Sequence, residues 1–207
     1  MGPNLLGGAG TSDGRTLVFA RRSDGLWTSD GAGRDAVRLA ADTTFDVRVT
    51  PDDRHVVFLS SRGDVEAPWI VPIDGGEPTV IDNVPTSWGS IDISSDGRLL
   101  FQSGGALVTC DLPSCENRRE LRVPANFGGR SRWTPDGQRI AYIGTRGTNL
   151  WTVATDGGPP RQLTRFQEND DRTIEAFAWS HDGQRLATVR TTTTSDIVLI
   201  RGLAPGP

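Results

Sequence analysis

Thr134-Pro135-Asp136-Gly137 is one of five related phrases that divide this chain of 207 residues into repeats. The other four are Thr11-Ser12-Asp13-Gly14, Thr50-Pro51-Asp52-Asp53, Ser94-Ser95-Asp96-Gly97 and Ser180-His181-Asp182-Gly183. Successive aspartates in the third position are 39, 44, 40 and 46 residues apart. This spacing is typical of a propeller blade built from four strands. A repeat unit is a scaffold, so its recurring residues indicate structure before they indicate chemistry.

Each phrase predicts a tight turn between two strands. Proline presets its own backbone angle, aspartate can bond to nearby backbone, and glycine accepts a left-handed conformation. Apolar residues occupy the slots three and five positions before the aspartate, namely Val47, Val49, Ile91, Ile93, Trp133, Phe177 and Trp179. This period of two marks one buried strand face. An apolar segment also follows every phrase, as in Val56-Val57-Phe58-Leu59 and Ile140-Ala141-Tyr142-Ile143. The turn therefore joins the first two strands of a unit.

Two further strands are predicted in each repeat. The third contains Leu26-Trp27-Thr28, Trp69-Ile70-Val71, Ala106-Leu107-Val108, Leu150-Trp151-Thr152-Val153 or Ile197-Val198-Leu199-Ile200. Glycine-rich turns such as Asp74-Gly75-Gly76 and Asp156-Gly157-Gly158 then lead to short fourth strands at Ala36-Val37-Arg38-Leu39, Pro78-Thr79-Val80-Ile81 and Arg161-Gln162-Leu163-Thr164. Glycine suits such hairpins because it adopts positive φ at little cost. The sequence predicts an all-β propeller of four-stranded antiparallel blades, with about five blades present.

The repeats resemble a known family. The segment Phe177-Ala178-Trp179-Ser180-His181-Asp182-Gly183 is similar to the WD40-like (PD40) repeats of TolB-type β-propeller proteins, and this resemblance covers nearly the whole chain. The Gly-His and Trp-Asp pairs of eukaryotic WD40 repeats are missing in register. The TolB-like propellers of the six-bladed superfamily are therefore the better match. The resemblance implies more than the five blades present here.

The last repeat resembles a narrower group. Leu163-Thr164-Arg165-Phe166, Ile174-Glu175-Ala176-Phe177 and Ser195-Asp196-Ile197-Val198-Leu199-Ile200 are similar to the C-terminal propeller of bacterial serine/threonine protein kinases. The chain contains no glycine-rich phosphate loop, no His-Arg-Asp catalytic loop and no Asp-Phe-Gly, so no catalytic residue is carried over. The resemblance implies the sensor end of such a kinase.

We expect a single domain over residues 1–207, with repeats at roughly 5–40, 41–82, 83–123, 124–166 and 167–203 and a tail at 204–207. Ring closure is open to two interpretations. Gly8 and Gly10 weaken the first inner strand, and no convincing fourth strand follows Ile200. Asn4-Leu5-Leu6 could complete the final blade of a five-bladed ring, or the chain could be a fragment of a larger propeller. We favour the fragment. An unclosed edge would expose strand hydrogen-bonding groups and permit self-association.

Charge and hydropathy exclude some partners. The net charge is −4, and no basic cluster alternates with aromatic residues. Nucleic acid is not expected, because phosphate binding needs a positive face. No signal peptide and no stretch of about 18 apolar residues is present, so direct membrane insertion is not expected. We expect a soluble protein, extracytoplasmic or periplasmic if it is part of a receptor kinase or a TolB-like protein, and otherwise cytoplasmic.

No catalytic, cofactor-binding or metal-binding residue is predicted. His181 is interpreted as a turn residue and His55 as a strand residue, and no Gly-x-Ser-x-Gly motif occurs. Calcium at Glu168, Asp170 and Asp171 is a weaker alternative because the ligand spacing is irregular. Cys110 and Cys115 flank a hairpin turn, where a disulfide and two reduced thiols are both open.

Candidate binding residues lie in loops opposite the aspartate turns, where a rigid ring usually places recognition. They are Arg62, Trp88, Arg146, Asp170 and Asp171. The arginines could pair with peptide carboxylates, although bonds to neighbouring backbone are the simpler interpretation for Arg62 and Arg146. Packing between blades is expected for Trp27, Trp69, Trp133, Trp151 and Trp179, which leaves Trp88 as the preferred contact aromatic.

The sequence therefore predicts a non-enzymatic scaffold that binds a protein or peptide, as the sensor or interaction part of a bacterial serine/threonine kinase. The alternatives are a free-standing TolB-like periplasmic interaction protein and the propeller of a prolyl-peptidase-like hydrolase.

Overall fold

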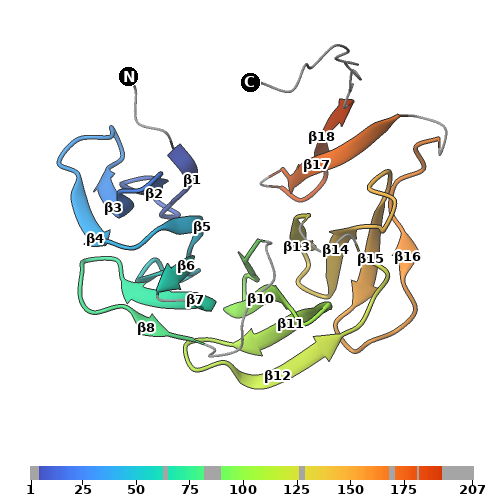
Figure 1. Cartoon of the computed structure of the whole chain (residues 1–207), viewed down its shortest axis with the longest axis horizontal. Helices are drawn as coiled ribbons and strands as arrows, with labels where there is room; N and C mark the ends of the chain where they lie inside the picture. Colours follow the sequence, from blue (N-terminus) through green and yellow to red (C-terminus); the bar gives the residue numbers. More distant parts are fainter. Residues whose placement is uncertain are drawn as a thin grey trace, which may run out of the picture.

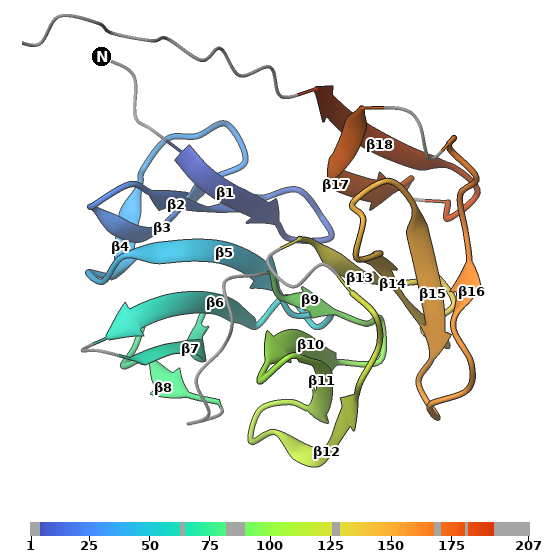
Figure 2. The same ribbon diagram turned by 45° about the vertical axis from the view of Figure 1, so that its right-hand side comes forward.

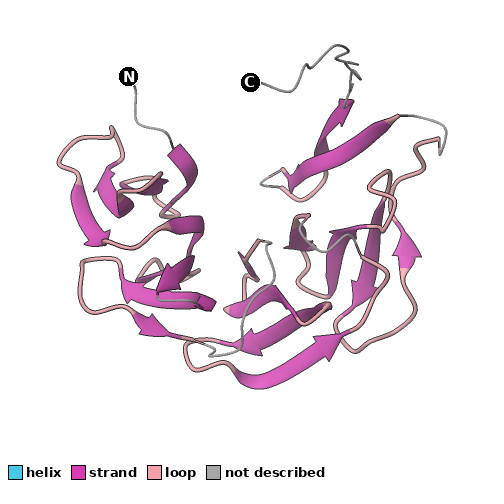
Figure 3. Ribbon diagram, viewed as in Figure 1, coloured by secondary structure: helices cyan, strands magenta, loops and turns pink. Residues whose placement is uncertain are grey.

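The computed structural model describes residues 5–62, 65–81, 90–125, 129–167, 171–180 and 182–192. Every regular element in these residues is a β-strand (Figure 3). Four of the sheets have four antiparallel strands, as predicted, and the described part of the fifth has two. The third strand expected there, Ile197-Val198-Leu199-Ile200, lies outside the described residues. The described part of the chain contains no helix long and apolar enough to cross a lipid bilayer.

The strands follow the chain in order within each sheet. The first sheet contains β1 (Leu5–Gly10), β2 (Thr16–Arg21), β3 (Gly25–Asp30) and β4 (Val37–Ala40), and the second contains β5 (Thr44–Val49), β6 (His55–Arg62), β7 (Val65–Pro72) and β8 (Thr79–Val80). The third contains β9 (Asp92–Ile93), β10 (Arg98–Ser103), β11 (Ala106–Asp111) and β12 (Glu116–Leu121). The fourth contains β13 (Ser131–Trp133), β14 (Arg139–Ile143), β15 (Leu150–Ala154) and β16 (Arg161–Gln162), and the fifth contains β17 (Arg172–Trp179) and β18 (Leu186–Thr192).

The five sheets follow one another around an arc, with the first strand of each sheet toward the middle and the fourth strand of the complete sheets on the outside (Figure 1). Figure 2 shows consecutive sheets stacked face to face, with β1 beside β5. This is the radial arrangement that the repeat spacing predicts.

The repeated phrase closes its own turn through a hydroxyl and a carboxylate. Thr134 Oγ1 donates to Asp136 Oδ1 at 2.6 Å and accepts from the Arg139 amide at 3.0 Å, and the Gln138 amide donates to the same carboxylate at 3.0 Å. The equivalent hydroxyl–carboxylate pairs are Thr11–Asp13, Thr50–Asp52, Ser94–Asp96 and Ser180–Asp182. The turn is therefore closed by bonds among its own residues and the first residue of the following strand.

The last position of the phrase requires a left-handed backbone. Gly137 has φ of 67°, and Asp53, the one residue there that is not glycine, has φ of 58°. A bond to the neighbouring sheet offsets the cost of this positive φ at Asp53, because the Ser12 amide donates to the Asp53 Oδ1 at 2.9 Å. This departure from glycine thus links two consecutive turns.

Apolar side chains fill the junction between each pair of neighbouring sheets. One cluster packs Val57 and Leu59 of the second sheet against Leu99, Phe101 and Val108 of the third, all at most 1% exposed. Three further clusters occupy the junctions of the first with the second, the third with the fourth, and the fourth with the fifth sheet. Burying one large apolar side chain contributes about 1.5–3 kcal/mol. Each sheet therefore depends on its neighbours for most of its core.

The tryptophans follow the predicted interblade packing with one exception. Trp69, Trp133, Trp151 and Trp179 pack in or against the junction clusters. Trp27 occupies the same strand position as Trp69, but the first sheet has no preceding sheet in the described structure. Its ring is instead covered by the Arg21 guanidinium at 4.5 Å and approached by the Arg38 guanidinium at 6.0 Å. Packing of Trp27 against another sheet stays a prediction.

The first strand decides against one of the two interpretations of ring closure, in which Asn4-Leu5-Leu6 completes the final blade. Leu5 pairs with Arg21 and Gly8 with Phe19, so Leu5–Gly10 forms the inner strand of the first sheet and does not complete the last one. The Thr11 turn connects β1 directly to β2, and closing so short a loop costs little entropy. Gly8 and Gly10 do not prevent this pairing, because backbone groups alone form the ladder.

The two cysteines form a disulfide across the β11–β12 hairpin, with Cα atoms 4.7 Å apart. Of the two alternatives left open by the sequence, the structure selects the bonded one. Cys110 is fully buried and belongs to the cluster between the second and third sheets.

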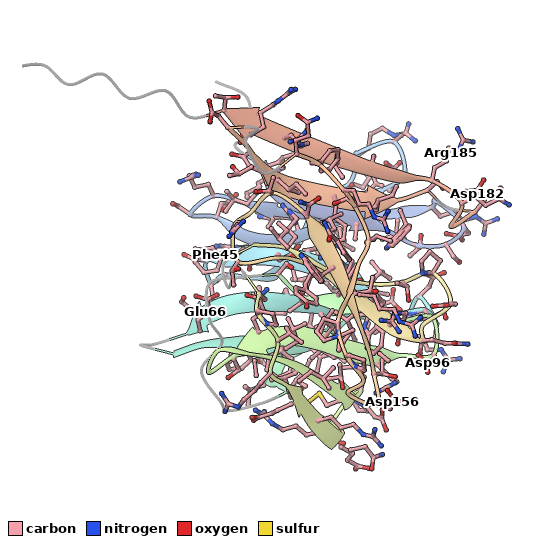
Figure 4. All side chains as sticks on the ribbon, turned by 90° about the vertical axis from the view of Figure 1, so that its right-hand side faces the viewer. Phe45, Glu66, Asp96, Asp156, Asp182 and Arg185 are labelled. Atoms are coloured by element: carbon pink, nitrogen blue, oxygen red, sulfur yellow. A yellow bond between two sulfur atoms is a disulfide. The ribbon has the colours of Figure 1, made fainter. Side chains whose placement is uncertain are left out.

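The loops sort onto two faces as the topology predicts. Asp96 and Asp182 of the repeated turns and Asp156 of a glycine-rich turn lie toward one side of the molecule, and Glu66 of the β6–β7 hairpin lies toward the other (Figure 4). The molecule therefore has one face that carries the repeated turns and an opposite face that carries the other loops.

Replacing Phe101 with alanine is expected to reduce the free energy of unfolding by about 3–5 kcal/mol, because the cavity opens at a sheet junction where relaxation is limited. Val37→Ala is the control, since Val37 is 60% exposed on an outer strand and should change stability by less than about 0.5 kcal/mol. Urea unfolding followed by tryptophan fluorescence measures both. Equal effects of the two variants would contradict the junction packing.

The turn carboxylates predict acid sensitivity. The Thr134 hydroxyl and the Gln138 amide hold the pKa of Asp136 below its usual value, and the Thr50 hydroxyl and Arg54 amide do the same for Asp52. A folded-state pKa below the unfolded value of about 3.9 contributes stability above that pH, and this is lost as pH falls through the folded value. Urea unfolding measured down to about pH 3 should show this loss, and Asp136→Asn should reduce its steepness. An unchanged acid slope in this variant would contradict the assignment.

Candidate functional site

Only some of the binding residues proposed from the sequence lie within the described structure. Trp88 and Asp170 fall outside the described residues, as does Glu168 of the calcium alternative. Arg62 ends strand β6, Arg146 is exposed between β14 and β15, and Asp171 is exposed just before β17. No group of three or more His, Cys, Asp or Glu side chains in the described ranges is placed to hold a metal ion.

Arg146 borders a cavity of about 240 Å³ together with Asn149 and Trp151. Asn149 positions the segment leading to the fifth sheet, since its Oδ1 accepts from the Phe166 amide at 2.8 Å. The Ile174 amide donates to the Gly147 carbonyl at 2.7 Å, which places the start of β17 beside the Arg146 loop. The structure thus brings the Arg146 loop close to the segment that follows Asp171.

A larger cavity of about 660 Å³ lies in the middle of the arc. Its walls come from β1, from residues of the second to fourth inner strands, and from β17 and β18. On the second to fourth sheets the lining residues lie between or beside the buried junction slots of the inner strands, whereas on the fifth sheet the junction residues Phe177 and Trp179 line the cavity as well. The first and fifth sheets contribute small and larger apolar residues, among them Gly7, Ala9, Ala176 and Ala178 and also Leu6, Phe177, Trp179 and Val189. The middle three repeats contribute the charged residues Asp46, Arg48, Asp92, Arg130 and Arg132.

Asp46 connects the second sheet to the third. Its Oδ1 accepts from Arg48 Nη1 at 2.8 Å and from the Val47 amide at 3.0 Å, while its Oδ2 accepts from the Ile91 amide of the next sheet at 3.2 Å. Asp46 is only 7% exposed. A buried carboxylate is tolerable here because its oxygens have donors.

Asp92 repeats this arrangement one sheet further on. Its Oδ1 accepts from Arg48 Nε at 3.1 Å, and its Oδ2 accepts from the Trp133 amide of the fourth sheet at 2.8 Å. Arg132 Nη1 returns a bond to the Ile91 carbonyl at 3.1 Å. The charged residues around the cavity therefore hold three consecutive inner strands together.

The pKa values of the Arg48 and Arg132 guanidinium groups are shifted in opposite directions. Burial opposes the charge of Arg48, but the carboxylates of Asp46 and Asp92 outweigh it and raise the Arg48 pKa. Burial, reinforced by the nearby Arg48 charge, lowers the pKa of Arg132 to about 10. Arg132 remains protonated at neutral pH, but its positive charge is less well compensated than that of Arg48.

These cavity residues are not among those proposed from the sequence, although the sequence carries a signal for them. Arg48, Asp92 and Arg132 each lie four residues before the aspartate of a repeated turn. That slot falls between the buried slots used to assign the inner strands. A charged residue in this slot of an otherwise apolar inner strand indicates a polar cluster near the axis of the propeller.

No family model matches the chain. The crystal structure of TolB from Acinetobacter baumannii matches with a TM-score of 0.73 over 87% of this chain, at 19% sequence identity. The fold is that of a TolB-like β-propeller. This chain covers 48% of that TolB chain, about half its length.

Solved structures of other proteins also match this fold. Oligogalacturonate lyase from Vibrio parahaemolyticus matches with a TM-score of 0.67 and 19% identity, over 92% of this chain and 59% of the lyase. A chain of a nidogen/laminin complex matches with a TM-score of 0.63 and 12% identity, over 88% of this chain and 66% of that one. At these identities the likeness shows the fold alone, and the fold accommodates enzymes as well as other proteins.

Asp92→Ala is expected to reduce the free energy of unfolding by about 3 kcal/mol, because it leaves Arg48 without one ion-pair partner and the Trp133 amide without its acceptor. Asp92→Asn should cost less, since an amide oxygen can still accept from Trp133. Asp156→Ala, at an exposed turn, is the control. Thermal unfolding ranks the three variants, and an Asp92→Ala variant as stable as the control would contradict the connecting role.

Proposed function

We propose that this chain is a non-catalytic TolB-like propeller scaffold that binds a protein or peptide partner. The observation in its favour is the central cavity of about 660 Å³, which combines small apolar residues with charged ones. Its volume lies within the range of about 300–1,000 Å³ typical of ligand sites. A few residues of an extended peptide could enter it from the loop face, where Arg62, Trp88, Arg146, Asp170 and Asp171 remain proposed contacts.

The state of the cavity carboxylates supports binding over catalysis. A general base needs a carboxylate that can reach and accept a substrate proton. Both oxygens of Asp46 and of Asp92 already accept hydrogen bonds from Arg48 or from backbone amides. These carboxylates therefore serve to join the sheets, and using one as a base would disrupt a sheet junction.

The biological setting we propose is the sensor or interaction part of a bacterial serine/threonine kinase. It rests on the resemblance of the last repeat to kinase-associated propellers, and it places the domain outside the cytoplasm. A free-standing TolB-like periplasmic interaction protein is the alternative within the same binding class. A propeller belonging to a prolyl-peptidase-like hydrolase is the alternative in which catalysis lies in another domain. An in-frame kinase, a signal peptide or a hydrolase domain in the neighbouring coding sequence distinguishes the three.

Selection of displayed random peptides on the purified chain tests the binding function. Selected peptides should bind wild-type protein and remain intact by mass spectrometry. Ala178→Trp, which places a large ring at an exposed cavity position, should lose this binding because the ring occupies the space of the ligand. Val37→Trp is the matched control, since it adds the same ring to an exposed outer strand and should retain binding.

Equal binding by the two tryptophan variants would contradict the cavity as the binding site. Cleavage or chemical conversion of a selected peptide, absent in a mock preparation, would contradict the non-catalytic assignment.

A further inference from the structure

The charged residues of the central cavity do not balance one another. Three arginines and two aspartates line it: Arg48, Arg130, Arg132, Asp46 and Asp92. Arg48 lies between both carboxylates, at 2.8 Å from Asp46 and 3.1 Å from Asp92. Each carboxylate also accepts an amide from the next sheet. One arginine charge is therefore in surplus at the cavity wall.

Arg130 and Arg132 together present this surplus. Both Arg132 bonds that the structure shows use Nη1, to the carbonyls of Ile91 and Ser131, and within the described residues its Nε and Nη2 have no hydrogen-bond partner. No hydrogen bond or ion pair joins Arg130 to another described side chain. A guanidinium presents its donors in a planar fork that matches a carboxylate. The wall thus offers donors that the protein itself does not fully use.

The electrostatic environment agrees with this geometry. Burial and then the charges of Arg48 and Arg130 lower the pKa of Arg132, and the two aspartates offset this only in part. An anion bound beside Arg132 would supply the missing compensation. Across the cavity, Ala176 and Ala178 are small and leave room for the rest of a ligand.

We propose that Arg130 and Arg132 form a binding site for a carboxylate, supplied by an acidic side chain of a peptide that enters the central cavity. A singly charged carboxylate fits because the cavity has a surplus of one positive charge, whereas a phosphate dianion would leave an excess negative charge beside Asp46 and Asp92. The peptide as the source of the carboxylate rests on the proposed binding function. The anion site itself does not.

A blocked peptide that alternates Glu and Ala tests the site against the same peptide with Gln in place of Glu. Isothermal titration calorimetry should show tighter binding of the Glu peptide, by about tenfold or more for a charge-assisted pair. Arg130→Gln should remove this preference. Arg130 is chosen because Arg132 also bonds to backbone, and Arg161→Gln is the control because Arg161 is exposed on the outer strand of the same sheet.

Acetate and inorganic phosphate test the anion site without a peptide. Acetate should shift the side-chain Nε resonances of Arg130 and Arg132 in a saturable manner in NMR titrations, and phosphate should bind no more tightly than acetate. A preference of about tenfold or more for phosphate would overturn the carboxylate assignment.

The outcomes separate the two proposals. Equal binding of the Glu and Gln peptides, or equal affinities of Arg130→Gln and Arg161→Gln, would overturn the carboxylate site while leaving peptide binding in place. Saturable acetate shifts without binding of either peptide would support the anion site and contradict the peptide-binding function. Absence of both acetate and peptide binding would contradict both.

Discussion

The structure depends on face-to-face packing between consecutive sheets. A four-stranded sheet of this size cannot bury its apolar faces alone, and each junction cluster draws side chains from two neighbours. The same dependence explains the first sheet, whose outward face has no preceding sheet in the described structure. There, arginine side chains cover Trp27 where another sheet covers Trp69. The packing that stabilises the middle sheets is thus a property of pairs of repeats.

The polar centre of the arc follows from that packing. On the middle sheets, Asp46, Arg48, Asp92 and Arg132 lie next to the junction slots of the inner strands and line the central cavity. Asp46 and Asp92 use this position to accept amides from the next sheet, so the charged residues that could recognise a ligand also fix the spacing of the strands. The Arg132 guanidinium is also held by the Ile91 and Ser131 carbonyls, so a bound anion would lose less to reorganisation at this arginine.

Much of this fold could be predicted from local sequence. The turn phrase and the two residues after it contain the groups that close the turn, and the alternating apolar slots around it fix the register. The four-stranded antiparallel sheets of the first four repeats, their order and the two loop faces were therefore correctly predicted. Some features depend on information that a single repeat does not contain. The environment of Trp27 depends on whether another sheet precedes it, and the local sequence left open whether Asn4-Leu5-Leu6 completes the last blade. The cavity charges were not predicted, because the candidate sites were sought in the loops. Arg48, Asp92 and Arg132 lie instead on or beside the inner strands, four residues before the aspartate of a repeated turn.

The central claim is that the second, third and fourth sheets are joined near the axis by Asp46 and Asp92, which accept amides across the two junctions between these sheets. Native-state hydrogen exchange of the Ile91 and Trp133 amides tests this most directly. The account predicts that both amides exchange only through global unfolding, at rates like those of buried strand amides such as that of Phe101. Exchange as fast as that of an exposed loop amide would contradict it.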